Sequence, residues 1–232
     1  MNSPFDDHTV DLDRERRCGF GEVIYGEGKS FELIWEIANR QIEAGQRGLV
    51  TRVDPSIGER LRTALPCPAV HDAAARTLQW GPDVEAVSPA AELDRPHVAV
   101  VTAGSTDAPV AAEAAATLRW MRMPFRQYVD IGVAGPWRLD GRLEELRRAE
   151  VIVVVAGMEG ALPSVVAGHV AVPVIAVPTS VGYGANLQGV TPLLTALASC
   201  AAGVMTVGID AGFKGGYCAG LILDRIRHSR EG

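Results

Sequence analysis

The sequence predicts an α/β fold: a three-layer α/β/α sandwich around a parallel sheet, preceded by a small α+β domain. Two observations support this prediction. Residues 151–155 and 174–177 are short, almost wholly apolar runs, as expected of strands that are buried on both faces of a parallel sheet. Between residues 97 and 230, such runs alternate with helical patterns, which is typical of a parallel sheet covered by helices.

Composition and charge narrow the function classes. The 232 residues are 47% hydrophobic and 22% charged, which is ordinary for a globular protein. The net charge is −6, whereas a nucleic-acid-binding protein is expected to have an excess of basic residues. No apolar run is long enough to span a membrane. Residues 1–17 hold no apolar signal core. We therefore expect a cytoplasmic protein that binds neither nucleic acid nor membrane.

The four cysteines are Cys18, Cys67, Cys200 and Cys218. Their spacing fits neither a metal site nor a disulfide framework. We expect reduced thiols, which are usually buried apolar fillers.

The chain is expected to contain two domains. Composition changes near residue 95, and residues 81–96 combine three prolines with little periodicity, which predicts a linker. Residues 1–94 are therefore assigned to a small N-terminal domain with its linker, and residues 95–232 to the larger domain.

The N-terminal domain is expected to contain a β-α-β unit followed by two helices. In order, its elements are a strand, a helix capped by Ser30, a second strand and the two further helices, at residues 22–25, 31–45, 48–53, 56–65 and 72–79.

The larger domain is expected to alternate strands with helices throughout. The strands are predicted at residues 97–102, 128–133, 151–155, 174–177 and 204–208. The helices are predicted at residues 109–121, 143–148, 162–168, 192–199 and 216–226. Because the carboxyl ends of parallel strands meet at one edge of a sheet, we expect the five loops after the strands to converge on a ligand there.

The first two of these loops are candidate anion sites. Gly104 permits a sharp turn, and Ser105 lies where amides at a helix start can hold a phosphate. Asp107 is either a nucleotide contact or only the cap of that helix. The segment is not a P-loop, because the GK[ST] pattern is missing. In the second loop, Gly135 shapes the turn and Arg138 is either a planar fork for phosphate or carboxylate or an ordinary surface arginine.

The remaining loops supply further candidates. After the third strand, Gly157 lets the backbone approach a ligand, and Met158 and Glu159 follow; the alternative is a tight turn with a solvated glutamate. The fourth loop is glycine-rich and long enough to fold over a ligand. Its candidates, with one from the fifth loop, are Ser180, Gly182, Tyr183 and Lys214.

Cys200 is a candidate nucleophile with an unfavourable position. It follows a predicted helix, whose carboxyl end is the negative end of the helix dipole and disfavours a thiolate. Lys214 or a cationic substrate would be needed to offset this effect.

Several long motifs together carry a resemblance. The segments GSTD, MEGALPSVVAG, PVIAVPTSVGYGA, LASCAAGV and GIDAGFKGGY resemble the LarB family, whose larger domain is similar to aminoimidazole ribonucleotide carboxylases. The N-terminal RRCGFGEVIYGEGKS and LVTRV also resemble that family. The similarity spans about residues 10–228.

The resemblance implies a purine-carboxylase-like sandwich behind a small N-terminal domain, assembled as a homo-octamer. It implies carboxylation at C5 of the pyridinium ring of nicotinic acid adenine dinucleotide by CO₂ or bicarbonate, with hydrolysis of the phosphoanhydride. The products would be pyridinium-3,5-biscarboxylic acid mononucleotide and AMP. A divalent metal, Mg²⁺, would assist at the phosphates, and no organic cofactor is implied.

The same resemblance gives roles to single residues. The catalytic cysteine of the family matches Cys200 within SCA, and its essential glutamate matches Glu159 within GMEG, for acid–base work or for holding a metal or water. The resemblance and the loops together assign substrate contacts to Gly104, Ser105, Asp107, Gly135, Arg138, Gly157, Met158, Ser180, Gly182, Tyr183 and Lys214.

One loop departs from the family pattern. Where a histidine usually precedes the arginine of the second loop, this chain has Pro136 and Trp137, and the indole would offer an apolar or stacking wall. Three alternatives stay open: a carboxylase of a related pyridinium nucleotide, an aminoimidazole ribonucleotide mutase, and a nucleotide-binding homologue without catalysis.

Overall fold

The structure is a computed structural model that describes residues 9–82, 84 and 95–231. The chain divides into two compact units, Met1–Val87 and Ser88–Gly232. Most of the expected linker, including residue 94 at the expected domain boundary, lies outside the described residues. No described helix is both long and apolar enough to cross a bilayer. All four cysteines are free.

The N-terminal unit contains a four-stranded sheet with the order β1-β2-β4-β3. Its elements are α1 (Arg14–Cys18), β1 (Ile24–Tyr25), α2 (Phe31–Glu43), β2 (Gly48–Thr51), α3 (Pro55–Ala64), β3 (Ala69–Asp72) and β4 (Thr77–Trp80). The strands β1 and β2 are parallel and enclose α2 in the chain, so the predicted β-α-β unit is confirmed.

Side-chain caps fix the starts of both long helices of this unit. The Ser30 hydroxyl accepts the N–H of Leu33 at the start of α2, as the sequence predicts. At α3, the Asp54 carboxylate accepts the N–H groups of Ser56 and Ile57. The helices bury their apolar faces in a core with the sheet, and this core includes Ile34, Val50, Leu61 and Leu78.

The helix predicted at residues 72–79 is wrong, because this segment forms the β3–β4 hairpin. The Asp72 carboxylate accepts the N–H groups of Ala74 and Ala75, which closes a turn in place of a helix. Residues 77–80 are fully buried and pair with β2 on their other side. Pairing and burial therefore override the helix propensity of the three alanines before them.

The second unit contains a five-stranded, wholly parallel sheet with the order β6-β5-β7-β8-β9. Its strands are β5 (Val98–Thr102), β6 (Phe125–Tyr128), β7 (Val151–Ala156), β8 (Val174–Pro178) and β9 (Val204–Thr206). Every residue of the three central strands β5, β7 and β8 is buried. The apolar runs therefore are strands buried on both faces, and the predicted α/β sandwich is confirmed.

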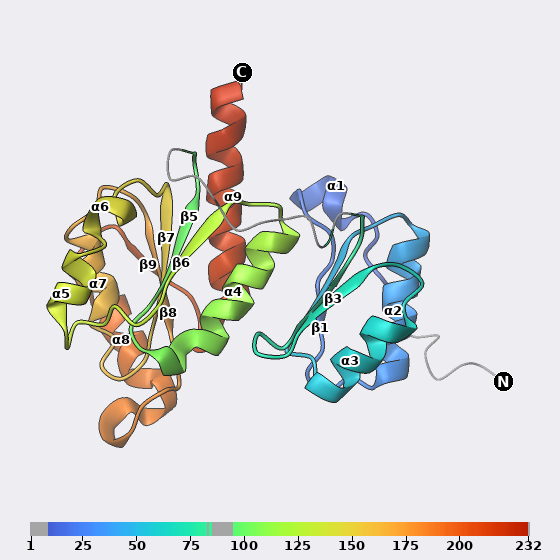
Figure 1. The fold of residues 1–232 in the computed structure, drawn as a ribbon, viewed down its shortest axis with the longest axis horizontal. Helices are drawn as coiled ribbons and strands as arrows, with labels where there is room; N and C mark the ends of the chain where they lie inside the picture. The colour runs from blue at the N-terminus through green and yellow to red at the C-terminus, as the bar shows by residue number, and fades with distance from the viewer. Residues whose placement is uncertain (1–8, 83, 85–94, 232) are drawn as a thin grey trace. The chain divides into compact units, whose positions relative to one another are not determined.

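Helices cover both faces of this sheet (Figure 1). The helical segments are η1 (Ser105–Asp107), α4 (Ala108–Trp120), α5 (Pro136–Asp140), α6 (Leu143–Leu146), α7 (Leu162–Ala167), η2 (Gly184–Gly189), α8 (Val190–Leu197) and α9 (Gly212–Glu231). One face has a core formed by the sheet with Leu139, Leu146, Leu162 and Val166 of α5, α6 and α7. The helices α4 and α9 pack against each other and against the sheet.

The strand predicted at residues 128–133 lies earlier in the chain than expected. Phe125 to Tyr128 pair with Val98 to Val101, and the strand ends before Asp130, whose φ of 60° is left-handed. The Asp130 N–H donates to the Thr102 hydroxyl instead of continuing the ladder. The helix α5 was not predicted from the sequence, although its first residue, Pro136, suits the first turn of a helix.

A stripe of glycines lets α9 pack closely on α4. A Cβ added to Gly212 would lie 2.2 Å from the carbonyl oxygen of Val110, and one added to Gly216 would lie 2.5 Å from that of Ala114. Both obstacles are backbone atoms, which cannot rotate away. The α4–α9 contact therefore depends on hydrogen in place of a side chain at these positions.

We expect Gly216→Ala to destabilise the protein. Alanine favours a helix over glycine by about 1 kcal/mol, but overpacking against backbone costs roughly 1–3 kcal/mol and should prevail. Thermal unfolding should show a melting temperature lower by about 2–5 °C. The control is Gly208→Ala, whose new Cβ would have no neighbour nearer than 3.8 Å. An unchanged melting temperature in Gly216→Ala would contradict this packing.

Candidate active site

A pocket of about 260 Å³ opens at the carboxyl edge of the parallel sheet. It lies where the chain passes from β5 to β6 on one side and then to β7 on the other, the place where open α/β sheets bind ligands. Six of the residues predicted from the sequence line it, namely Gly104, Asp107, Arg138, Gly157, Met158 and Glu159. The predicted convergence of the first three loops is thus present, and Val181 adds the fourth.

The other predicted residues do not line this pocket; they are Ser105, Gly135, Ser180, Gly182, Tyr183, Lys214 and Cys200. The Ser180 N–H donates to a carboxylate oxygen of Asp210, which joins the fourth loop to the fifth. Tyr183 is 81% exposed and Trp137 is 70% exposed, and neither lines the pocket. Trp137 therefore forms no wall of the pocket within a single chain.

Asp107 is buried and connects three loops. One carboxylate oxygen accepts the Gly104 N–H at 2.9 Å, and the other accepts the Thr179 hydroxyl at 2.7 Å. The N–H of Gly157 also donates to this carboxylate. Asp107 thus ties the loops that follow β5, β7 and β8. With its oxygens engaged in this way, it positions the loops. Its side chain makes no capping hydrogen bond to α4, the helix that follows it.

The pKa of Asp107 is raised from its ordinary value of 3.8, because burial disfavours the charged form more than the hydrogen bonds favour it. In the folded state the carboxyl therefore binds a proton more tightly than in the unfolded chain. Its contribution to stability is fully present below the unfolded pKa and is lost as the pH rises through the folded pKa.

Arg138 is held at the mouth of the pocket. Its guanidinium forms an ion pair of 2.8 Å with Asp130 and donates to the Asp130 carbonyl oxygen. A Cβ on Gly135 would lie 2.6 Å from its Nε, so this glycine makes room for the arginine without itself lining the pocket. Sequence reasoning missed Asp130 because the strand was predicted at residues 128–133, which places this aspartate inside the strand; the strand ends at Tyr128 and Asp130 adopts a left-handed φ, which aspartate tolerates.

The loop that carries Glu159 is fixed by backbone contacts. Met158 has a left-handed φ of 52°, donates its N–H to the Val181 carbonyl oxygen, and accepts the side-chain amide of Asn186. Glu159 itself is exposed at the pocket and has no ion pair or side-chain hydrogen bond within the part of the chain that the structure describes. Its carboxylate is therefore available to a ligand.

Cys200 lies apart from the pocket in a single chain. It is exposed and follows α8, just before β9. The preceding Ser199 shares a hydrogen bond of 2.8 Å with Ser164 of α7, the helix that begins after the Glu159 loop. The segment that carries Cys200 thus contacts α7, the helix that follows the Glu159 loop. Cys200 itself does not line the pocket that Glu159 lines.

Among residues 9–82, 84 and 95–231, no group of three or more His, Cys, Asp or Glu side chains is arranged to hold a metal. At the pocket the carboxylates are Asp107, Asp130 and Glu159, of which the first two are engaged by hydrogen bonds or Arg138. Glu159 is the carboxylate left for a cation that arrives with a ligand.

Comparison with known proteins agrees with this architecture. Residues 97–230 match the family model of AIR carboxylase, and residues 5–81 match that of the LarB/PurE-like N-terminal domain. The chain belongs to the LarB family. An uncharacterized protein of Methanocaldococcus jannaschii is 38% identical to this LarB-family chain over 228 residues, which covers 94% of the chain and 84% of the relative.

A phosphoribosylaminoimidazole carboxylase of Candida glabrata is 33% identical over 106 residues. That match covers 45% of this LarB-family chain and 18% of the yeast protein. The likeness to this carboxylase is thus confined to part of the chain, whereas the archaeal relative matches 94% of it. The protein is a member of a carboxylase-type family.

We predict a pH-dependent effect of Asp107→Asn. The substitution places an amide donor where the carboxylate accepts N–H groups, and a buried unsatisfied donor costs about 1–3 kcal/mol. Because the wild type loses stability as the pH rises through the raised pKa of Asp107, the difference in unfolding free energy between wild type and variant should shrink as the pH rises above 3.8. Urea unfolding over a pH series measures this, and a difference that grows with pH would refute it.

Proposed function

We propose that this LarB-family protein carboxylates the pyridinium ring of nicotinic acid adenine dinucleotide at C5 and hydrolyses its phosphoanhydride. The products are pyridinium-3,5-biscarboxylic acid mononucleotide and AMP. The observation that carries the proposal is the pocket itself: an available carboxylate, Glu159, lies with the guanidinium of Arg138 at the switch point of a carboxylase-family sheet. An anionic nucleotide and a proton-transfer step call for these two groups.

The chemistry of the ring supports a covalent step by Cys200. A pyridinium is electron-poor and does not attack CO₂. A thiolate that adds at C4 breaks the aromaticity and makes C5 an enamine carbon, which does attack. Loss of the C5 proton and expulsion of the thiolate then restore the ring, so the cysteine is regenerated. The positive charge of the ring offsets the unfavourable helix end beside Cys200, and Glu159 is the proposed acceptor of the C5 proton.

Mg²⁺ fits the proposed site as a partner of the substrate phosphates. This ion is usually held by one or two carboxylates together with phosphate oxygens, and it keeps several waters. As the alternative to accepting the C5 proton, Glu159 would hold this ion, and the ion would supply charge neutralisation at the phosphoanhydride. In this proposal Arg138, which lines the same pocket, binds and orients the phosphates.

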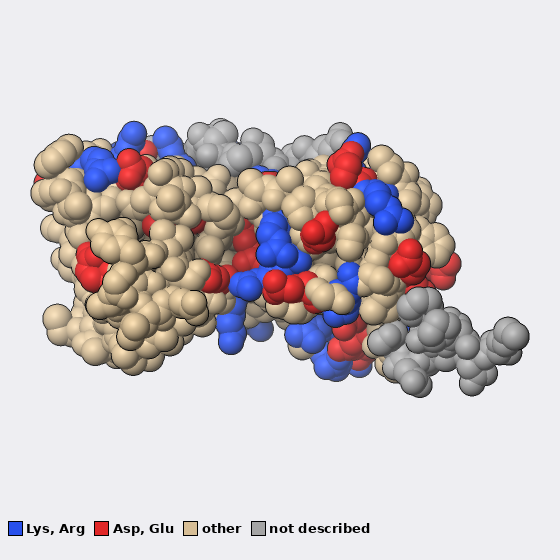
Figure 2. All heavy atoms as spheres, turned by 90° about the horizontal axis from the view of Figure 1, so that it is seen from below, with Lys and Arg blue, Asp and Glu red and all other residues tan. Residues whose placement is uncertain are grey.

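Assembly of several copies is part of the proposal, in line with the expected homo-octamer. The exposed face of α8 carries Val190, Leu194 and Leu197, and Leu187 and Met205 are exposed as well. Figure 2 views the molecule from below Figure 1. Over the region where Figure 1 places η2 and α8, it shows a broad area with few charged side chains. Large exposed apolar areas mark interaction sites. Because Cys200 follows this helix, we propose that a neighbouring copy covers α8 and that Cys200 of one copy serves the pocket of another.

A second candidate function is that of an aminoimidazole ribonucleotide carboxylase or mutase. The match of residues 97–230 to the AIR carboxylase family and the likeness to the yeast enzyme favour it. The second loop has Pro136 and Trp137 in place of the expected histidine, and the chain has Cys200, a nucleophile that ring carboxylation of an electron-rich imidazole does not need. These features favour the pyridinium substrate.

The products decide between the candidates. We expect that incubation with nicotinic acid adenine dinucleotide, bicarbonate and Mg²⁺ yields AMP and a mononucleotide heavier by one carboxylate, as measured by mass spectrometry. Incubation with aminoimidazole ribonucleotide should give no carboxylated product. Turnover of the imidazole substrate alone would replace the proposal by the second candidate, and binding of the dinucleotide without any product would identify a nucleotide-binding homologue.

Variants test the two proposed catalytic residues and the assembly together. Cys200→Ala and Glu159→Gln should each lower the rate of carboxylation by about 10³-fold or more while the protein stays folded. Cys18→Ala is the matched control, since Cys18 is also an exposed free cysteine. Unfolding and reassembling the two inactive variants as a mixture should restore measurable activity, because some pockets then combine an intact Glu159 with an intact Cys200 from another copy. A mixture as inactive as its components would show that both residues act within one chain.

A further inference from the structure

A second cavity of the unit Ser88–Gly232 adjoins the pocket that Glu159 lines, which we call the carboxylation pocket after its proposed function. Its volume is about 360 Å³, larger than the 260 Å³ of the pocket, and both are lined by Asp130 and Arg138. The remaining wall comes from β6 and from the segment around α5 and α6. We name it the arginine cavity after Arg126, Arg138 and Arg142, which line it. None of the motifs noted in the sequence includes Arg126 or Arg142.

Positive charge exceeds negative charge in the arginine cavity. Three guanidinium groups face two carboxylates, those of Asp130 and Glu145, in a chain whose net charge is −6. Glu145 is shared, because Arg142 lies 2.9 Å and Arg126 3.3 Å from its oxygens. Its hydrogen bond with Arg142 lowers the pKa of Glu145. One positive charge of the cavity is therefore not balanced by the side chains that line it.

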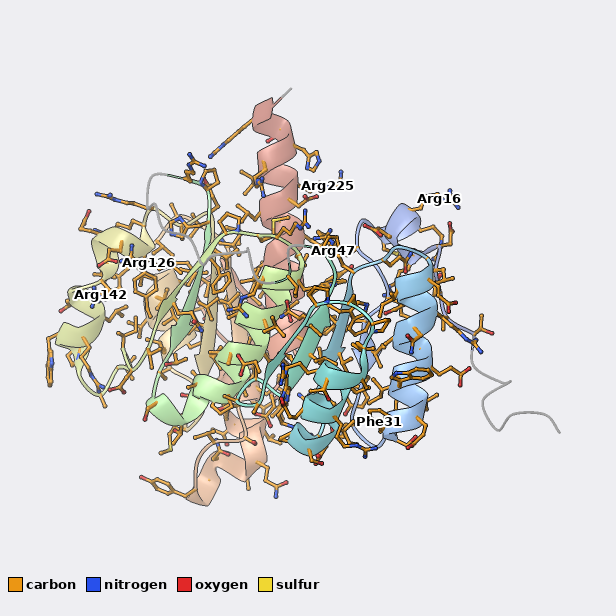
Figure 3. All side chains as sticks on the ribbon, turned by 45° about the vertical axis from the view of Figure 1, so that its right-hand side comes forward. Arg16, Phe31, Arg47, Arg126, Arg142 and Arg225 are labelled. Carbon is orange, nitrogen blue, oxygen red and sulfur yellow. The ribbon has the colours of Figure 1, made fainter. Side chains whose placement is uncertain are left out.

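The side chains of Arg126 and Arg142 extend from β6 and from the start of α6 on the same side of the unit (Figure 3). Both are half-exposed and can therefore move toward an entering anion. A guanidinium offers a planar pair of N–H donors that matches the oxygens of a phosphate. Two such groups line the arginine cavity together with Arg138, which also lines the pocket of Glu159.

Tyr128 provides a buried donor in this cavity. The residue is 5% exposed, and its hydroxyl makes no hydrogen bond of ordinary geometry, although Glu145 lies beside it. Burial, together with Glu145, raises the pKa of Tyr128, so this phenol holds its proton more tightly than a free one. A buried hydroxyl whose neighbouring carboxylate, that of Glu145, is not in ordinary hydrogen-bond geometry gains free energy from a better-placed acceptor. The hydroxyl thus points to a ligand with acceptor oxygens.

We propose that the arginine cavity binds the AMP half of the dinucleotide, with the second phosphate on Arg126 and Arg142 and the phosphoanhydride passing Arg138. This inference rests on the proposed function. The carboxylation pocket alone is smaller than the roughly 300–1,000 Å³ of ordinary ligand pockets, whereas a dinucleotide has two nucleotide halves. The adjoining cavity supplies the missing room, and its arginines supply the counter-charge of a second phosphate.

The test is binding of AMP to the full-length protein by calorimetry, which requires no turnover. Arg142→Gln and Arg126→Gln should each weaken AMP binding about tenfold or more, since each removes charge-assisted hydrogen bonds to phosphate. Tyr128→Phe should weaken it by a smaller factor while removing no charge. The control is Arg147→Gln, which removes the same charge from an exposed arginine outside the cavity. Binding of nicotinic acid mononucleotide should be unchanged in all four variants.

Three outcomes would overturn the inference. The first is an AMP affinity that neither cavity variant alters, and the second is an equal loss of affinity in Arg147→Gln. The third is competition by inorganic phosphate as strong as that by AMP, which would identify a free phosphate site. If the wild type binds AMP as described but never carboxylates the dinucleotide, the proposed function fails and the cavity assignment stands. If it does carboxylate, with an unchanged KM for the dinucleotide in Arg142→Gln, the cavity assignment fails alone.

Discussion

The buried carboxylate of Asp107 is the interaction on which the rest of the site depends. The sheet brings the ends of β5, β7 and β8 to one edge, but a parallel sheet alone does not fix the loops beyond those ends. Asp107 accepts hydrogen bonds from Gly104, Gly157 and Thr179 and so joins all three loops at one point. Glu159 follows two residues after Gly157, and its position is therefore set by a residue in another loop.

Arg138 extends this arrangement toward solvent. Its ion pair with Asp130 places one guanidinium on the wall between two cavities. The pocket beside Glu159 has the groups needed at the reacting ring in the proposed reaction, and the arginine cavity has the groups suited to a phosphate. A division into a reactive part and an anchoring part lets binding energy from the remote half of a substrate position the reacting half.

Much of the second unit could be predicted from the sequence, because buried parallel strands have an unmistakable composition. The runs at residues 151–155 and 174–177 are strands, and the loops after them line the site. Prediction failed where long-range pairing decides: residues 72–79 form part of a hairpin because β4 pairs with β2, and β6 lies early because Val98 pairs with Phe125. The helix and strand propensities of these segments do not depend on the partner strands β2 and β5, and so they cannot predict these pairings.

The candidate site was predictable in part for a related reason. Six residues in loops that follow strands were found, and Asp130 was missed because β6 ends earlier than predicted. Arg126 and Arg142 belong to a strand and a helix start and carry no motif. The separation of Cys200 from the pocket depends on how α7 and α8 pack, which spacing along the chain does not reveal.

The left-handed residues at this edge of the sheet have an evolutionary consequence. Asp130, Met158 and Asp210 all have positive φ without being glycine, and each such residue costs about 1 kcal/mol or more. A typical domain is stable by only roughly 5–15 kcal/mol, so these turns use a noticeable share of that margin. Selection for thermal stability would therefore disfavour these left-handed residues, whereas selection for the site geometry retains them. We expect a more thermostable homologue to gain its stability in the sheet and helices, away from these three turns.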